Sequence, residues 1–404
     1  DQNVIKCGSY VGSGSNDLEV NVGFEPSYVL LKNSSSADNW YVLDSMRGFI
    51  DNGGDNDIFL CADLNQAENG YNFGELTPTG FRLYGSSSAN NASGSTYIYM
   101  CIRRSDPLVQ KPAELGTDVF AMDTGTGSAT IPNFDSGFPV DFAIYRHPAS
   151  TGDWWVNARL MHGKELKTSS TDALTTYSGS VFDSNTGWNT GQASSAKSWM
   201  WKRHAGFDVV TYDGNAQAGR AIPHNLSKTP EMIWLKSTSH TFSWVIGHKA
   251  LDGGTNSWEH NLYFDTNDET DYPFWNDTAP TATHFTVGSD NYVNDSYREY
   301  LAVLFASVDG ISKVGSYDGS TSNVAVNIGF QPRFIILKKF TGSSSWAVFD
   351  SLRGMGSGND QYLRLESTVT QYAYDYLDIS STGFTITEND WRVNGQKYIY
   401  YAHA

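Results

Sequence analysis

The feature of this sequence that most constrains its fold is an internal repeat with a period of about 102 residues. The phrase "GFEPSYVLLKN", which begins at Gly23, returns as "GFQPRFIILKK" from Gly329. Two further phrases, "FPVDFAIYRH" and "TPEMIWLKS", occupy the corresponding places between them. The repeat predicts four copies, of which the second is the most diverged: residues 1–106, 107–206, 207–309 and 310–404.

Each copy contains short apolar segments separated by Gly, Asn, Asp and Ser, without an apolar stripe at helical spacing. This pattern favours an all-β fold of four tandem antiparallel β-sandwich domains, each of a jelly-roll or lectin-like kind. The run "RRSDPLVQKPAELGTD" (103–118) is the one linker-like segment that we identify. Elsewhere the copies follow one another within a few residues, so we expect a continuous stack of domains.

The central strand of each copy is apolar at successive positions rather than at alternate ones. Residues 334–337 read Phe-Ile-Ile-Leu, and the counterparts lie at 28–31, 142–145 and 232–235. A strand that is apolar on both faces must be covered on both faces, so we expect a long loop, a neighbouring copy or another subunit to cover its outer side. The following "W-x-V" segments, at Trp40, Trp244 and Trp346, alternate and are expected to be half exposed.

The three cysteines are too few for a disulfide framework. Cys7 aligns with Val314 and Cys101 with Ala402, which predicts apolar core positions for both. Cys61 aligns with Arg364, a position expected to face outward. Three unpaired thiols and a single Cys7–Cys101 bridge both remain open.

Charge and hydropathy exclude several classes of partner. The formal net charge of −17 argues against nucleic acid, because neutralising phosphates requires clustered Lys and Arg. No apolar run approaches the length of about 20 residues that spans a bilayer, so we expect no membrane insertion. No cofactor or metal motif is present. Since the chain begins at Asp1 without Met, processing or the choice of fragment is expected to have removed the native start.

Tryptophan supplies the candidate binding residues. Nine of the twelve tryptophans lie in the second and third copies. Flat aromatic rings beside polar groups suit stacking on sugars, whereas Trp199, Trp234 and Trp244 occupy strand positions typical of a core. The better ligand candidates are those in predicted loops: Trp154, Trp188, Trp258 and Trp275.

Three polar patterns are candidates for sites. Asp44 with Arg47, and Asp350 with Arg353, repeat as "DSxRG", which favours a structural pair across a turn. The segment "DNGGDNDI" (51–58) offers oxygen ligands for calcium but lacks the spacing of an EF-hand, so a solvated turn is preferred. The sequence contains no nucleophile elbow, zinc-ligand helix or P-loop. The carboxylates eligible for glycoside hydrolysis are Glu165, Asp183, Glu259 and Asp265.

The pattern "GSYxG … GFxPxxxxxK … WxVxDSxRG … TGF … YIYxA", together with junctions such as "LFASVDGISKVGSY", resembles a repeat domain of marine bacteriophages of the cyanophage and pelagiphage kind. The resemblance covers essentially the whole chain. It implies a role at the virion surface in a tail fibre or other appendage, with other virion proteins as partners, and lectin-like domains.

From these patterns we predict a non-enzymatic virion structural protein, homo-oligomeric, that attaches to a host-surface glycan. Two alternatives stay open: a capsid decoration or cement protein without a ligand, and a polysaccharide depolymerase.

Overall fold

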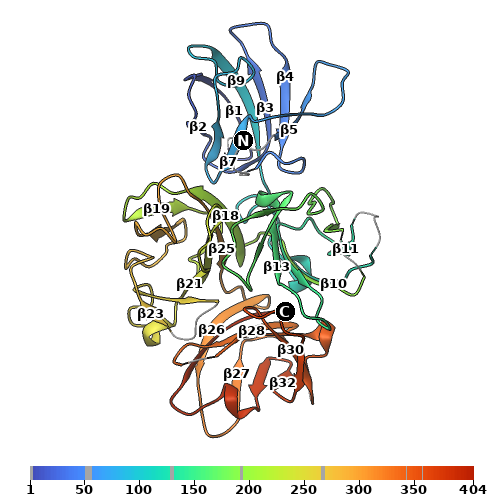
Figure 1. Ribbon diagram of the computed structural model, residues 1–404, viewed down its shortest axis with the longest axis vertical. Helices are drawn as coiled ribbons and strands as arrows, with labels where there is room; N and C mark the ends of the chain where they lie inside the picture. Colours follow the sequence, from blue (N-terminus) through green and yellow to red (C-terminus); the bar gives the residue numbers. More distant parts are fainter. Residues whose placement is uncertain are drawn as a thin grey trace.

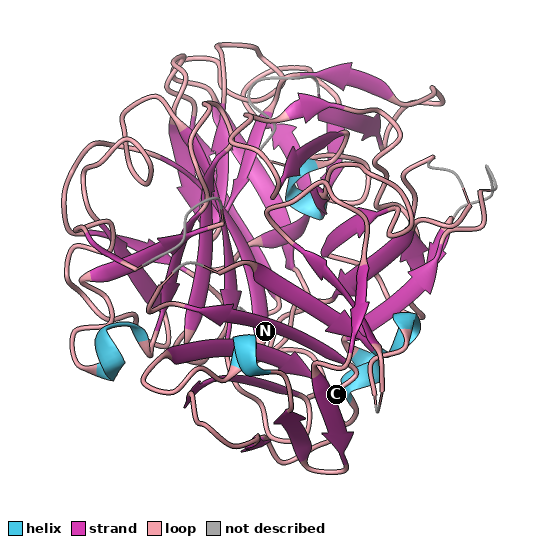
Figure 2. Cartoon of the chain, turned by 60° about the horizontal axis from the view of Figure 1, so that its bottom comes forward, coloured by secondary structure: helices cyan, strands magenta, loops and turns pink. Residues whose placement is uncertain are grey.

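The computed structural model describes residues 3–50, 57–127, 132–191, 194–264, 269–342, 344–356 and 358–404. These residues form antiparallel sheets joined by turns, with a few short 3-10 helices (Figures 1 and 2). The predicted all-β class is confirmed. No helix in this part of the chain is long and apolar enough to cross a membrane.

The first copy contains a six-stranded sheet and a three-stranded sheet. Its strands are β1 (Ile5–Val11), β2 (Leu18–Asn21), β3 (Pro26–Asn33), β4 (Trp40–Asp44), β5 (Asp57–Cys61), β6 (Asn69–Tyr71), β7 (Gly74–Thr77), β8 (Gly80–Leu83) and β9 (Thr96–Arg103). The second copy contains η1 (Gly116–Asp118), β10 (Phe120–Thr124), β11 (Phe134–Asp135), β12 (Phe142–Arg146), β13 (Trp155–Ala158), η2 (Arg159–Met161), β14 (Lys164–Lys167), β15 (Thr175–Thr176), β16 (Gly187–Trp188) and β17 (Lys197–Trp201).

The third copy contains β18 (Phe207–Asp213), β19 (Arg220–Pro223), β20 (Met232–Ser237), β21 (Val245–His248), η3 (Leu251–Gly254), β22 (His260–Tyr263), β23 (Thr270–Asp271), β24 (His284–Val287) and β25 (Glu299–Phe305). The fourth copy contains β26 (Ser312–Asp318), β27 (Val324–Asn327), β28 (Phe334–Lys339), β29 (Trp346–Asp350), η4 (Ser351–Arg353), β30 (Asp360–Arg364), β31 (Tyr372–Tyr374), β32 (Leu377–Ser380), β33 (Gly383–Ile386), η5 (Asn389–Trp391) and β34 (Lys397–His403).

Each copy builds its six-stranded sheet in the same spatial order. The first strand of the copy pairs with the last, the last pairs with the central strand, and three further strands follow: β1-β9-β3-β4-β5-β6, β10-β17-β12-β13-β14-β15, β18-β25-β20-β21-β22-β23 and β26-β34-β28-β29-β30-β31. The central strand is therefore hydrogen-bonded on both edges. We call the sheet face that packs within its own copy the inner face, and the opposite one the outer face.

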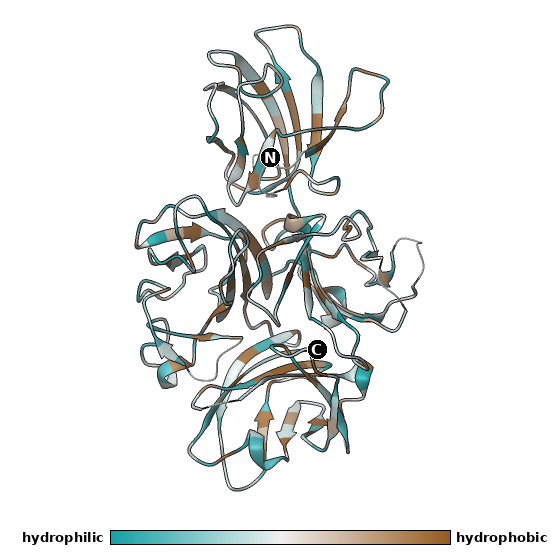
Figure 3. Cartoon of the chain, viewed as in Figure 1, coloured by the Kyte–Doolittle hydropathy of each residue, from teal (hydrophilic) through white to brown (hydrophobic). Residues whose placement is uncertain are grey.

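The inner faces form separate apolar cores. In the fourth copy, for example, Ile335 and Leu337 of β28 share a core with Val326 of β27 and Phe384 of β33, which belong to the smaller sheet. Corresponding cores form in the other three copies. Brown segments follow the strands of all four copies in Figure 3, as expected where alternate side chains enter a core.

The outer faces of the second, third and fourth copies pack against one another and form one further core, the shared core, which Ile50 from a loop of the first copy also joins. In Figure 1 these three copies gather around a common centre, while the first copy stands apart at one end. One row of side chains runs across each sheet into this core. The rows are Trp199, Ile144, Val156 and Leu166 in the second copy; Val209, Val303, Trp234, Ile246 and Leu262 in the third; and Val314, Tyr401, Ile336, Val348 and Leu363 in the fourth.

Three tryptophans at equivalent positions link the copies in a cycle around the shared core. The Nε1 of Trp244 donates to the carbonyl of Lys167 at 2.8 Å, from the third copy to the second. Trp346 donates to the carbonyl of Tyr263 at 3.0 Å, from the fourth copy to the third.

The remaining bond of the cycle runs from the second copy to the fourth, where Trp154 Nε1 donates to the carbonyl of Arg364 at 2.6 Å. Each donor lies two residues before the row residue of its strand, and each acceptor lies one residue after the last member of its row. The three copies therefore obey a pseudo-threefold arrangement in which every interface repeats the same bond.

The expectation that a neighbour covers the doubly apolar central strand is met in these three copies, where the cover is another copy. The prediction that Trp244 and Trp346 are half exposed is wrong, since both are buried in the shared core. Trp40 of the first copy does remain half exposed, at 37%.

A buried cluster of charges fixes the first copy onto the second and third. Arg104 Nη2 donates to Asp208 Oδ1 at 2.8 Å, and Arg203 Nη1 donates to Glu25 Oε1 at 2.7 Å. Arg104 and Glu25 also pair, at 3.2 Å. All four side chains are less than a tenth exposed. Because removing one partner would strand a buried charge, the junction holds the first copy in one orientation.

The cysteines are unpaired in the structure. Cys101 is buried, as predicted. Cys7 is exposed and Cys61 is buried, so both of those predictions are wrong. The two cysteines lie on opposite faces of the sheet. Cys7 is on the uncovered outer face of β1, opposite Met100, and Cys61 is on the inner face of β5, opposite Tyr41. A Cys7–Cys101 bridge is absent because Cys101 stands opposite Lys6.

Aspartate side chains at two positions of the repeat hold loops in place through ion pairs and hydrogen bonds. Asp44 pairs with Arg47, and Asp350 Oδ2 accepts a hydrogen bond from Arg353 Nε at 2.7 Å, which confirms a structural pair in "DSxRG". Buried Asp57 accepts hydrogen bonds from the backbone N–H groups of Phe73 and Gly74 at 2.8 and 3.1 Å. Burial raises the Asp57 pKa to about 8.

Replacing Trp244 by Phe tests the cyclic contacts. The change removes the indole N–H and leaves the carbonyl of Lys167 without this donor, so it should lower the free energy of unfolding by about 1–3 kcal/mol beyond the loss of ring volume. Trp275→Phe is the matched control, because Trp275 is equally buried and its Nε1 has no partner among the described residues. Equal losses in the two variants, measured by urea unfolding, would contradict the assignment.

Asp57 predicts a pH dependence of stability. Between pH 3.8 and about 8 the folded chain keeps the Asp57 proton that the unfolded chain releases, so this residue's contribution to stability falls as pH rises through that range. Asp57→Asn removes the titration and keeps an oxygen for the two N–H groups. The free energy of unfolding of the variant minus that of the parent should increase with pH over this interval, and a constant difference would refute the prediction.

Candidate functional site

An open groove lies where the first copy meets the third. It has a volume of about 610 Å³. The first copy contributes residues from β2 and β8, and the third contributes the end of β18, the start of β19 and the loop before β25. The groove is lined by Asp17, Glu19, Arg82, Tyr84, Asp213, Gly214, Asn215, Arg220, Ser296, Tyr297 and Glu299.

Arg82 forms the floor of the groove and joins its two walls. Its Nη1 pairs with Glu75 of β7 and with Asp213 of β18. Glu75 also accepts a hydrogen bond from Tyr84 Oη at 2.5 Å. Burial, together with the nearby Asp213 carboxylate, raises the Glu75 pKa to about 7, although Arg82 acts in the opposite direction. Glu75, the acid whose pKa is raised, therefore already pairs with Arg82 and accepts a hydrogen bond from Tyr84 within the floor of the groove.

Tyr297 stands at the rim of the groove with 99% of its surface exposed. Its backbone has a φ of 65°, a left-handed conformation that is uncommon for a bulky residue. The loop is braced on either side of it. Asp295 accepts a hydrogen bond from Arg298 Nε at 2.6 Å, and the Asp295 N–H donates to Tyr300 Oη at 2.8 Å. The ring is therefore displayed by a fixed loop.

The sister copies show what this position normally holds. Two residues before the closing strand, the first copy has Gly94 with φ 75° and the fourth has Gly395 with φ 78°, while the second has the small residue Ser195 with φ 81°. Glycine takes this backbone conformation without a steric cost, whereas another residue carries a strain of about 1–3 kcal/mol. The third copy places a tyrosine there and leaves its ring in water. Neither folding nor packing accounts for that choice, which favours a role in binding.

The groove combines three kinds of group that recognise polar ligands. Tyr297 offers an aromatic face, Asp17 and Glu19 are exposed carboxylates that accept hydrogen bonds, and Arg220 supplies a donor. Arg220 is held by Asn294 Oδ1 at 3.3 Å and stacks over Tyr212, with 5.6 Å between its Cζ and the ring centroid. This arrangement suits a ring-shaped ligand rich in hydroxyl groups.

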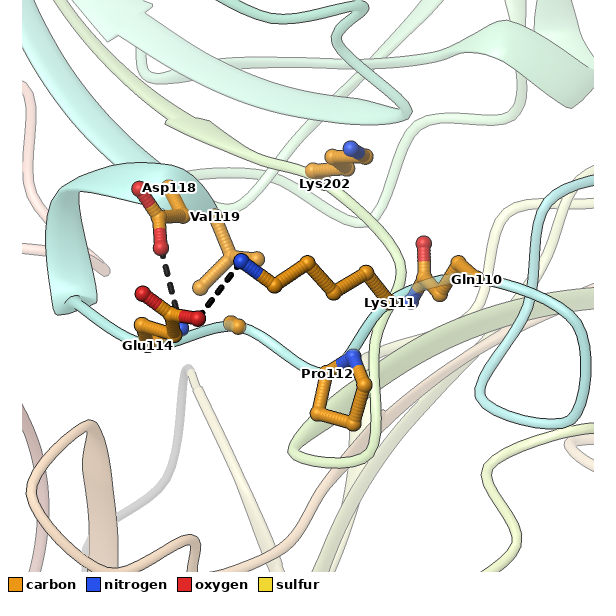
Figure 4. Close-up of a pocket in the computed structure, with 8 residues that line it drawn as sticks. Gln110, Lys111, Pro112, Glu114, Asp118, Val119 and Lys202 are labelled. Carbon is orange, nitrogen blue, oxygen red and sulfur yellow. Dashed lines mark hydrogen bonds and ion pairs between the residues drawn. The ribbon is translucent and has the colours of Figure 1, made fainter.

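A second hollow, of about 320 Å³, lies along the linker between the first and second copies (Figure 4). Lys111 pairs with Glu114 at 2.5 Å, and both are exposed. Asp118 accepts hydrogen bonds from the N–H groups of Glu114 and Leu115, at 3.0 and 2.9 Å. These polar groups satisfy one another within a single turn, and no aromatic ring lines the hollow. It has the chemistry of a loop rather than of a ligand site.

The four tryptophans predicted as ligand contacts are all buried, which corrects the expectation that they display their rings in loops. Trp154 belongs to the cyclic contacts of the shared core. Trp188 lies in β16, where its Nε1 donates to Ser198 Oγ at 3.0 Å. Trp258 and Trp275 pack edge to face in the third-copy core, with 5.5 Å between ring centroids. The four residues line three separate cores, and none has a ring face open to a sugar.

The carboxylates eligible for hydrolysis do not form a described site. Glu165 is buried in β14, within 3.4 Å of Tyr145 Oη, and burial raises its pKa to about 7. Asp183 is exposed on a separate loop and Glu259 is half buried in the third copy. Asp265 lies outside the described residues, as do residues 51–56 of the segment considered for calcium. The described residues contain no cluster of three or more His, Cys, Asp or Glu placed to hold a metal ion.

Tyr297 is not among the ligand contacts predicted from the sequence, because an abundance of tryptophan does not reveal a single tyrosine in an unusual position. The signal was present in the copies themselves. "SGS" before the first closing strand and "NGQ" before the fourth align with "SYR" in the third. A glycine position that becomes an aromatic in one copy points to a displayed ring.

A comparison with known families now places the sequence. The family model described as Domain of unknown function (DUF7483) matches residues 3–105 and 183–404. The chain belongs to this family. The DUF7483 match omits residues 106–182, which cover most of the diverged second copy. No curated protein matches the chain.

Tyr297→Gly tests whether the residue is retained at the expense of stability. Glycine relieves the left-handed strain but makes the unfolded chain more flexible, so the free energy of unfolding should stay equal or rise by up to about 1 kcal/mol. Thermal and urea unfolding would measure it, with Gly395→Tyr in the fourth copy as the reverse change, expected to destabilise. A marked loss of stability in Tyr297→Gly would mean that the tyrosine supports the fold.

Proposed function

We propose that this DUF7483 protein is a non-enzymatic structural protein of a bacteriophage virion, part of a tail fibre or similar surface appendage, and that it attaches to a glycan of the host surface. The groove between the first and third copies is the attachment site. The observation that carries the proposal is Tyr297, a fully exposed ring held in a left-handed backbone conformation where the first and fourth copies have glycine and the second has the small Ser195.

The architecture supports this role. We interpret the chain as four tandem β-sandwich domains, because each six-stranded sheet shares a core with a smaller sheet or loops of its own copy. Residues 1–106, 107–206, 207–309 and 310–404 are the four domains. The repeat resembles virion proteins of marine phages. On that resemblance we place the protein at the virion surface, with other virion proteins as its partners. Neither nucleic acid nor membrane insertion is part of the proposal.

The charges narrow the class of glycan. Asp17, Glu19 and Glu299 line the groove, and the chain carries a net charge of −17. An acidic polysaccharide would be repelled as it approached. Neutral sugars, whose hydroxyl groups can donate to carboxylates, and amino sugars, whose ammonium group pairs with them, fit the groove better.

The floor of the groove supports the proposal of binding without hydrolysis. Glycoside cleavage by two carboxyl groups needs an acid and a base that both reach the scissile bond. Glu75, the acid with the raised pKa, is buried and bonded to Arg82 and Tyr84. Asp213 pairs with the same arginine. Both acids are thus committed to the contact between the first and third copies.

A capsid decoration or cement protein is the second candidate. The apolar outer face of the first copy favours it, since such a face suits assembly more than ligand binding. A protein of this class would bind no glycan through the groove.

A glycan array decides between the two candidates. The chain should bind a subset of neutral or amino glycans reproducibly, and Tyr297→Ala should weaken binding by about tenfold, since a stacked ring contributes about 0.5–1.5 kcal/mol beyond the area that it buries. Tyr374→Ala is the matched control, because Tyr374 is 53% exposed in the fourth copy, outside the groove. Silence across the array, or equal binding by both variants, would reject the groove and favour decoration.

A further inference from the structure

The outer face of the first copy repeats the outer faces of the other three in register but is not covered. Its row runs Cys7, Met100, Leu30, Val42 and Leu60 across β1, β9, β3, β4 and β5. Every equivalent side chain in the third and fourth copies is buried in the shared core. In the first copy, Cys7 is exposed and the other four are half buried.

Side chains beside the row show the same contrast. Ile98 is 39% exposed, whereas its equivalents Leu301 and Ile399 are buried. Ile5 is 43% exposed, whereas its equivalent Phe207 is buried. A contiguous apolar sheet face of this kind is normally covered in a soluble protein.

The polar positions of this face also match those of a covered one. Lys32 and Asp44 take the places of Lys338 and Asp350 in the fourth copy. Asp44 already pairs with Arg47, as Asp350 does with Arg353. At these two positions the face therefore has the same charged groups as a face that is buried in the shared core.

The donor and the acceptor of the cyclic contacts are both present on the first copy. Trp40 occupies the position of Trp154, Trp244 and Trp346, and its ring is 37% exposed. The carbonyl of Cys61 occupies the position of the three acceptors, one residue after Leu60. Within one chain these two groups cannot meet, because each interface of the cycle joins the donor of one copy to the acceptor of another.

A second hydrogen bond between the covered copies, from a cationic side chain to a main-chain carbonyl, also has its equivalent groups on the first copy. Lys236 Nζ donates to the carbonyl of Thr171 at 3.1 Å, and Arg146 Nη2 donates to the carbonyl of Thr368 at 3.3 Å. Both acceptors lie four residues after the carbonyl that receives the tryptophan bond of the same interface. The equivalent cation in the first copy is Lys32, and the equivalent acceptor residue is Asn65.

We propose that three chains associate through the outer faces of their first copies and form a second three-sheet core like the shared core, with Trp40 of each chain donating to the Cys61 carbonyl of the next. The occupant is two further copies of this chain, because donor and acceptor are distinct surfaces. Two chains related by the same rotation as two neighbouring copies of the shared core would form one bond and leave one donor and one acceptor open, whereas three copies already close this cycle within one chain.

Mass in solution tests the stoichiometry. At tens of micromolar, light scattering should give three times the chain mass of 44.6 kDa. Leu30→Asp places a carboxylate at the centre of the row and should give single chains that remain folded by circular dichroism, since Leu30 is only half buried in the isolated chain. Leu108→Asp is the matched control, because Leu108 is 66% exposed in the linker, and it should keep the trimer mass.

The cysteines supply an independent measurement. Cys7 lies on the proposed interface, whereas Cys61 and Cys101 are buried in the isolated chain. A maleimide should label native protein slowly in the trimer, and Leu30→Asp should restore rapid labelling of one thiol per chain. Trp40→Phe, which keeps an aromatic ring, should shift the trimer midpoint to higher protein concentration even if Leu30→Asp fails to fold. A single-chain or two-chain mass for the parent protein, or a trimer that survives Leu30→Asp with Cys7 reactive, would overturn the proposal.

Discussion

The burial of three doubly apolar sheets against one another is the interaction on which this molecule depends. A strand such as Phe334–Lys339 cannot leave either face in water, so a copy that stood alone would expose a whole apolar surface. Packing the second, third and fourth copies face to face removes three such surfaces at once. The cyclic tryptophan bonds then satisfy backbone carbonyls that would otherwise lose their water in the shared core.

The first copy is attached by different means. Its contact with the rest of the chain relies on buried charges, Glu25 and Arg104 with Arg203 and Asp208, instead of on a sheet face. That choice leaves its outer face free and sets its β2 and β8 beside β18 and β19 of the third copy. The groove exists only because this junction holds the two copies in a fixed relation, so the proposed binding site is a property of the assembly of copies and not of any one repeat.

Part of this architecture can be predicted from the repeat, because a period of about 102 residues with short apolar segments and no helical stripe indicates an all-β fold. The apolar run at 334–337 also predicts a cover over the central strand. What the repeat alone leaves open is which surface supplies that cover: Trp244 and Trp40 have the same local pattern, yet one is buried between copies and the other faces water. The expected exposure of Trp154 is wrong for the same reason, since burial by a neighbouring copy depends on long-range packing that residue type does not report. Trp188 is instead buried in the core of its own copy.

For Tyr297, the backbone conformation can be predicted from the sequence but the surroundings cannot. Its position is readable from sequence once the copies are aligned, because Gly94 and Gly395 mark a left-handed turn. Its exposure beside Asp17 and Glu19 is not readable, because that neighbourhood forms between copies that are distant in sequence.

The cyclic contacts also bear on how such a repeat can diversify. In each interface the acceptor is a main-chain carbonyl, so the side chain at that position is free to change, and it is Lys167, Tyr263 or Arg364 in the three covered copies. Only the tryptophan has to be kept. A gene encoding these repeats can therefore accumulate substitutions at the acceptor position of each interface without losing the hydrogen bond between neighbouring copies.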